Sequence, residues 1–151
     1  MTRHDPRDEP APKHTPAPGV DPATIEAVGV VSEALETVER ARGHLYSFHQ
    51  LMGHADLLLG DACDKLRDAG HADAADLLER DMIGRNVLDG RWTFQIVEEF
   101  DDGYWSAFRK HELAVRDQLV RGQRHLHEAS MKEDRRTHGR ANHESRPASS
   151  E

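Results

Sequence analysis

The fold is decided by the stretch VSEALETVERARGHLYSFHQLMGHADLLLGDACDKL, residues 31–66. Large apolar residues recur there at every seventh position: Val31, Val38, Leu45, Met52, Leu59 and Leu66. A second row, offset by three, consists of Ala27, Ala34, Ala41, Phe48, Ala55, Ala62 and Ala69. Alternating steps of three and four are typical of a coiled-coil seam. The pattern predicts one helix over residues 24–69, about 70 Å long, whose alanines allow a partner helix to approach closely.

The flanking residues predict the rest of an all-α fold. Asp21 and Pro22 read as an N-cap and first helical residue, and Gly70 as a C-cap. A short helix over residues 72–82 and a second long helix over residues 88–136 follow. Two long helices with a short connector predict an antiparallel hairpin. Facing residue numbers then sum to roughly 160, which pairs Leu59 with Phe100, Met52 with Phe108 and Leu45 with Val115.

Composition predicts three segments along the chain. Residues 1–20 contain five prolines among charged and small residues, and such a composition predicts a disordered tail. Residues 21–137 form the predicted helical hairpin domain. Residues 138–151 are polar and predict a second disordered tail.

The predicted first helix carries more apolar residues than one seam needs. Val30, Leu51 and Leu58 lie on one flank, and Val28 and Leu35 on the other. A four-helix bundle formed by two copies of the hairpin would bury them. The sequence therefore predicts a homodimer.

Charge and hydropathy limit the compartment and the partners. The net charge is −8, and the segment 56–102 alone holds 13 acids against 5 bases. This balance disfavours nucleic acid as a partner, because phosphates need cations. No apolar run reaches the roughly 18 residues that cross a bilayer, and the N-terminus lacks a signal-peptide core. The lone Cys63 fits a reducing compartment and reads as a packed thiol. We expect a cytoplasmic protein.

Two clusters of side chains are candidate metal sites. The roughly 160 pairing rule places His49 beside His111 and Glu112, a set that suits zinc or a similar divalent ion. The structural alternative is a pair of half-buried histidines that bond to each other, to Glu112 or to water. Glu98, Asp101 and Asp102 share a second helical face. Calcium or magnesium would relieve their repulsion, and the alternative is a solvated acidic flank.

The known catalytic spacings are missing from the sequence. No Glu-x-x-His, His-Glu-x-x-His, Gly-x-Ser-x-Gly or Cys-x-x-Cys pattern occurs. The aromatic side chains Trp92, Tyr104 and Trp105 suit either the core or an interaction surface. The sequence favours a protein that is not an enzyme and needs no cofactor.

The phrases GHLYSFHQLMGHADLLLGDACDKLRDAGH, GRNVLDGRWTFQIVEEFDDGYW and EASMKEDRRTHGR resemble a set of uncharacterised helical proteins of actinobacteria. The resemblance covers about residues 30 to 140. It implies a cytoplasmic bacterial protein and assigns no activity and no role to any residue.

Two functional hypotheses follow from the sequence. The first is a non-enzymatic helical scaffold that self-associates and binds a protein partner. The alternative is a helical bundle that binds a metal or small ligand through a histidine and carboxylate site.

Overall fold

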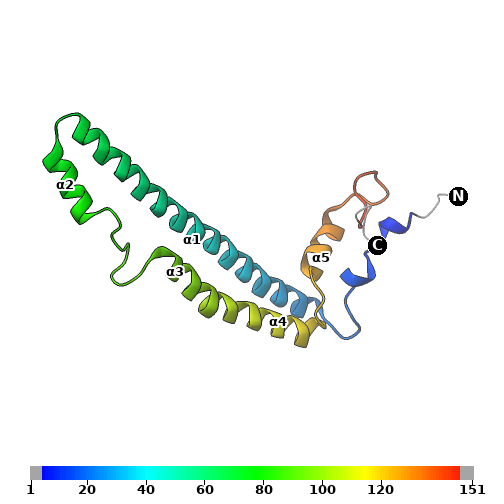
Figure 1. Ribbon diagram of the computed structural model, residues 1–151. Coiled ribbons are helices and arrows are strands. Elements are labelled where there is room, and N and C mark those ends of the chain that lie inside the picture. The colour runs from blue at the N-terminus through cyan, green and yellow to red at the C-terminus, as the bar shows by residue number, and fades with distance from the viewer. Residues whose placement is uncertain (1–4, 147–151) are drawn as a thin grey trace. The chain divides into compact units, whose positions relative to one another are not determined.

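The computed structural model describes residues 5–146, which contain five α-helices and no β-strand (Figure 1). The α-helices are α1 (Pro22–Asp68), α2 (Ala72–Asp81), α3 (Thr93–Phe100), α4 (Ser106–Val120) and α5 (Leu126–Arg135). A π-helical turn, Asp101–Trp105, joins α3 to α4. The predicted all-α class is confirmed. None of the helices in the described part has both the length and the apolar character that a bilayer crossing requires.

The chain divides into two compact units, and α1 contributes to both. Unit 1 takes residues 1–36 and 108–151, of which 5–36 and 108–146 are described. Unit 2 takes Thr37–Ala107. Each unit has contacts of its own, and we describe them separately.

The two ends of α1 form as the sequence predicts. Asp21 Oδ1 accepts a hydrogen bond of 2.7 Å from the Thr24 backbone N–H, which caps the first turn and lowers the pKa of the Asp21 carboxyl. At the other end, Gly70 adopts φ +87°. The Gly70 N–H donates to Arg67 O and the His71 N–H to Leu66 O. These two bonds form a Schellman motif, whose left-handed residue favours glycine.

In unit 2 the chain that follows the turn at Gly70, called the returning chain below, runs back along α1. Successive contacts join Cys63 to Ala75, Asp56 to Gly84, His49 to Thr93 and Arg42 to Asp101. The predicted pairings of Leu59 with Phe100 and Met52 with Phe108 are therefore wrong. The prediction assumes that residues 70–88 form a connector that does not pack along α1. In the structure α2 and the segment after it lie against α1 (Figure 1).

The seam that α1 presents differs from the predicted one in one of its two rows. The row from Val31 to Leu66 is partly buried along its length, as predicted. The alanine row is exposed from Ala27 through Ala55. The row that completes the buried seam is offset by four instead of three, and comprises Val28, Leu35, Arg42, His49, Asp56 and Cys63. The prediction that the alanines face the chain's own second helix is therefore wrong. The second row of the buried seam is filled largely by polar residues, and the apolar pattern of the sequence does not mark them as buried.

The predicted second long helix, residues 88–136, is not continuous. Helical structure begins only at Thr93, widens into the π-helical turn and stops at Val120. Left-handed backbone follows at Arg121, Gly122 and His125, with φ of 54°, 73° and 60°. No helix continues through such residues, and α5 starts anew at Leu126.

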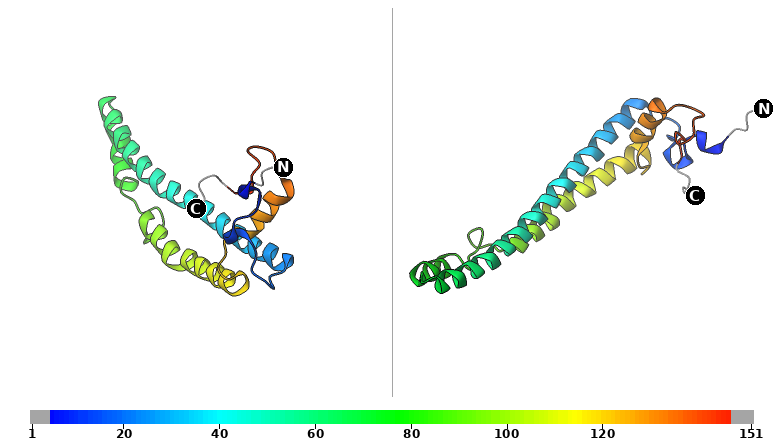
Figure 2. Two further views of the ribbon diagram at one scale, coloured as in Figure 1. Left: turned by 90° about the vertical axis from the view of Figure 1, so that its right-hand side faces the viewer. Right: turned by 90° about the horizontal axis from the view of Figure 1, so that it is seen from above.

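The core of unit 1 lies where α5 meets the start of α1 (Figure 2). Ile25 and Val28 of α1 pack with Val120 and Leu126. The close approach depends on Gly29, because a Cβ there would lie 2.8 Å from the Cβ of His127. The glycine is thus required by helix packing.

The terminal segments of unit 1 are held by two arginines. The Arg136 side chain is 1% exposed and bonds to Asp8 Oδ1 at 3.1 Å and to Glu133 Oε2 at 2.7 Å. The Arg146 Nε–H donates to the Glu9 carbonyl at 2.7 Å. Short 3₁₀ turns form at Pro6–Asp8 and Pro12–His14. The predicted disordered tails, 1–20 and 138–151, extend beyond the described residues at 1–4 and 147–151.

Candidate functional site

The buried row of α1 in unit 2 carries polar side chains that all bond to the returning chain. His49 Nδ1 lies 2.6 Å from Thr93 Oγ1, and Asp56 Oδ1 accepts from the Gly84 backbone N–H at 2.8 Å. Cys63 is fully buried, with Sγ 3.7 Å from the Ala75 carbonyl oxygen. Burial raises the pKa of this thiol, which disfavours the thiolate that a nucleophile requires. We call Arg42, His49, Asp56 and Cys63 the inner polar row.

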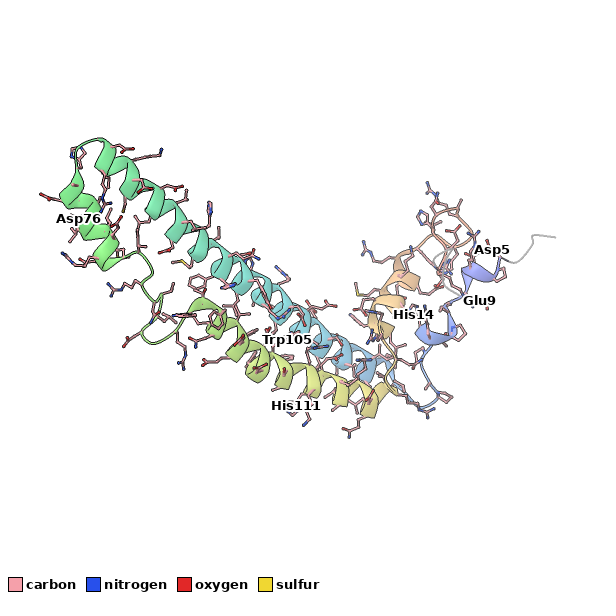
Figure 3. The ribbon with its side chains drawn as sticks, viewed as in Figure 1. Asp5, Glu9, His14, Asp76, Trp105 and His111 are labelled. Atoms are coloured by element: carbon pink, nitrogen blue, oxygen red, sulfur yellow. The ribbon has the colours of Figure 1, made fainter. Side chains whose placement is uncertain are left out.

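Arg42 is the most highly connected member of the inner polar row. Its Nε–H donates to Asp101 Oδ1 at 2.7 Å and its NH2 group donates to Oδ2 at 3.0 Å. The guanidinium carbon lies 3.9 Å from the centre of a Trp105 ring, a cation–π contact. The Trp105 indole N–H donates to Glu39 at 2.8 Å. Figure 3 shows Trp105 on the side of its segment that faces α1.

The π-helical turn sets the spacing of Asp101 and Trp105. The Ser106 backbone N–H donates to the Asp101 carbonyl five residues earlier, which widens the helix by one residue. Both side chains then meet Arg42. π-Helical turns are rare and, where they occur, often lie at functional sites, but the Asp101 carboxylate and the Trp105 indole N–H of this turn both bond to α1.

The predicted acidic set is divided by this arrangement. Asp101 is partly buried and bonded to Arg42, which lowers the pKa of its carboxyl below the usual range. Glu98 and Asp102 are exposed. The contacts of Asp101 are those of a structural ion pair, and the calcium or magnesium reading of Glu98, Asp101 and Asp102 stays a prediction.

The predicted histidine set is spread over both units. His49 belongs to unit 2 and is bonded to Thr93. In unit 1, His111 is exposed (Figure 3), whereas Glu112 is buried. Glu112 Oε1 accepts from Ser32 Oγ at 3.0 Å and from Arg116 Nε at 3.1 Å. Glu112 is therefore committed to contacts within α4 and to α1.

The three aromatic candidates have different surroundings. Trp105 is shielded by Arg42. Trp92 is 61% exposed and packs edge-to-face on Phe94, with ring centres 5.3 Å apart. Tyr104 is 59% exposed and stacks on Phe100 at 6.0 Å. Trp92 and Tyr104 are thus accessible, and Trp105 is part of the internal packing of unit 2.

A largely apolar face of α1 is exposed in unit 2. Phe48, Leu51 and Leu58 are 40%, 63% and 53% exposed. We call this surface the outer face; its members are Ala41, His44, Phe48, Leu51, Ala55 and Leu58. Their steps of three and four repeat the spacing of a coiled-coil seam. Ala41 and Ala55, which the sequence pattern assigns to the seam inside the hairpin, belong to this exposed face. Their seven-residue spacing does not reveal that they are exposed.

Unit 1 contains a cavity of about 550 Å³ between α1, α4 and the start of α5. Its wall includes the apolar Ile25, Val28 and Leu126 and the basic Lys110 and Arg124. A cavity of this size is within the usual range for a small ligand.

No group of three or more His, Cys, Asp or Glu side chains within residues 5–146 is arranged to hold a metal ion. The zinc alternative at His49, His111 and Glu112 stays a prediction. Comparison with known proteins adds nothing to this geometry: no protein family, no curated protein and no solved structure matches the chain.

Proposed function

We propose that the protein is a non-enzymatic helical scaffold that self-associates through the outer face of α1 and binds a protein partner. The observation that carries this proposal is the exposure of large apolar residues at seam spacing: Phe48, Leu51 and Leu58 are at least 40% exposed. Single exposed apolar residues need no explanation, but a strip of apolar residues such as Phe48, Leu51, Ala55 and Leu58 marks an interaction surface.

The finer architecture belongs to the same proposal. In unit 2 the contacts of α1 pair falling residue numbers with rising ones, from His49 with Thr93 to Glu39 with Trp105. In unit 1, Ser32 is bonded to Glu112. These orders favour an antiparallel hairpin, and two hairpins joined through their outer faces would make a four-helix bundle.

The outer face is also the right kind of surface for self-association. About 18 residues of helix, from Ala41 to Leu58, rise roughly 26 Å and give a strip that is long enough for several interlocking layers. The alanines let the helices approach closely, and Phe48 and Leu51 supply the apolar area near its middle.

The test is the mass of the native chain by light scattering across micromolar concentrations, for the wild type and for Leu51→Asp. We expect a dimer for the wild type and a monomer for the variant, because burying an unpaired carboxylate costs at least about 2 kcal/mol per site. Leu57→Asp is the matched control. Leu57 is 72% exposed on the same helix but lies outside the outer face, so this variant should remain dimeric.

A monomeric wild type at all concentrations would refute self-association. Loss of the dimer in both variants would show that added charge on α1, not the outer face, is responsible.

In this proposal Trp92 and Tyr104 contact a separate protein partner. Both are more than half exposed, and aromatic anchors are enriched at interfaces. Trp92→Ala should leave the dimer mass unchanged. Loss of the dimer in Trp92→Ala would instead assign Trp92 to the self-association surface.

A further inference from the structure

Two opposite charges flank the outer face at its two ends. Arg40 precedes Ala41 and Asp61 precedes Ala62, so each lies one position before a member of the alanine row. Both side chains are exposed. Within residues 5–146 neither of them forms an ion pair. Ser47 and His54 occupy the same flank between them, at seven-residue intervals.

We propose that the outer face docks onto the outer face of a second copy running in the opposite direction, with Arg40 against the partner's Asp61. This inference rests on the proposed self-association and adds the orientation and the register. In an antiparallel coiled coil, residues on this flank face the same flank of the other helix. Residue numbers on the flank then sum to roughly 101, and the two-fold axis creates the ion pair twice.

The same register fits the sizes of the side chains. Seam residues that face each other sum to roughly 99, so Phe48 meets the partner's Leu51 near the axis. Ala41 then meets the partner's Leu58, and His44 meets the partner's Ala55. A large residue faces a small one in the outer layers, which allows close packing without a cavity.

A parallel arrangement lacks these complementary pairs. Each seam residue would meet its own copy, so that His44 would face His44 of the partner subunit. Arg40 would face the opposite flank of the other helix, which is the row of Val38, Leu45 and Met52. That row is already partly buried against the returning chain and offers no charge.

A shift of the antiparallel register by one heptad toward the C-terminal end of α1 is also less favourable. It would bring Lys65 into the seam against the partner's Ala41, and His54 would face its own copy across the axis. The arrangement with Arg40 opposite Asp61 keeps the charges at the flank and the apolar residues in the seam.

The first experiment is a charge exchange, read as the dissociation constant of the dimer by analytical ultracentrifugation at low salt. Arg40→Glu and Asp61→Lys should each weaken the dimer by about tenfold, because each places like charges opposite one another twice. The double variant should recover affinity to within about threefold of the wild type. Arg85→Glu makes the same charge change at an exposed residue of unit 2 outside α1 and should leave affinity unchanged.

A double variant as weak as the two single changes combined would overturn the orientation. If Leu51→Asp still abolishes the dimer in that case, self-association stands and only the antiparallel register fails. A monomeric wild type refutes both.

The second experiment tests the register by cross-linking. Ser47→Cys and His54→Cys chains, mixed and treated with a short bis-maleimide, should give a covalent dimer that contains one chain of each kind. Each variant alone should stay uncross-linked, because identical positions lie a full heptad apart. Cross-linking of Ser47→Cys to itself, or of His54→Cys to itself, would overturn this register. The native Cys63 is fully buried and stays unreacted in the folded chain.

Discussion

Arg42 shows how one residue can hold three partners by two kinds of contact. Its guanidinium forms a two-point ion pair with Asp101 and lies over Trp105 and, at 5.0 Å from the ring centre, Tyr46. A lysine in its place would lose the planar fork that makes both the ion pair and the stacking possible. The heptad pattern predicted the row of Leu45 and Met52, but the polar row beside it was not recognised, because a charged residue at a seam position has no apolar signal.

A second arginine, Arg136, leads to a prediction about the pH dependence of stability. Hydrogen bonds from Arg136 and His138 lower the pKa of Glu133 from 4.5 to about 2. Between these values the unfolded chain binds more protons at Glu133 than the folded chain does. The stabilisation is therefore complete above pH 4.5 and is lost as the pH falls through about 2.

We expect the free energy of unfolding to fall by about 1–2 kcal/mol across that range. The loss is smaller than the pKa shift alone implies, because the Glu133 side chain is 33% exposed and screened by water. Urea unfolding at a series of pH values measures the loss. Glu133→Gln should remove this part of the pH dependence, and an unchanged slope in the variant would contradict the assignment.

At the scale of elements, α1 is a helix with two seams about 100° apart. One seam faces the returning chain and is partly polar, and the other is the uncovered outer face. The predicted second helix, residues 88–136, is interrupted for two local reasons. The π-helical turn leaves no signature in the apolar spacing, and the break at Arg121–His125 depends on left-handed backbone that two non-glycine residues adopt.

The glycines of α1 offer a paired test of helix packing. Gly29→Ala should destabilise unit 1 by about 1–3 kcal/mol, because the new Cβ would lie 2.8 Å from His127 Cβ and 2.9 Å from its Cγ. Gly43→Ala should stabilise the protein by up to about 1 kcal/mol, because nothing lies within 4 Å of its Cβ. Thermal unfolding followed by circular dichroism compares the two. Equal effects of the same sign would show that α5 does not pack on α1 at Gly29.

At the scale of the whole molecule, charge and packing are divided between two units. Unit 2 carries 14 acids and 7 bases, and hence −7 of the total −8, while unit 1 is nearly neutral with 14 acids and 13 bases. Unit 1 has an apolar core at Val120 and Leu126, whereas the seam of unit 2 combines partly buried aliphatic residues with the inner polar row. Different interactions therefore stabilise the two units.

This division predicts that the units respond separately to core mutations. Trp92 and Trp105 both belong to unit 2, so tryptophan fluorescence reports only that unit, while circular dichroism reports both. Leu126→Ala should destabilise unit 1 by about 2–4 kcal/mol and move the dichroism transition to lower urea, leaving the fluorescence midpoint in place. Val97→Ala, in the buried part of α3, should move the fluorescence midpoint. A common shift of both signals in Leu126→Ala would show that the chain unfolds as a single unit.

The sequence by itself determined the helical class, the bounds of α1 to within two residues, its capping by Asp21 and its end at Gly70, because seven-residue spacing and end signals are local properties of the chain. Only the tertiary structure decided which of two adjacent rows is buried, since both rows satisfy the same period and differ by a rotation of the helix. It also decided that Arg42, His49 and Asp56 face inward. Their burial depends on bonding partners at Asp101, Thr93 and Gly84, which lie far along the chain.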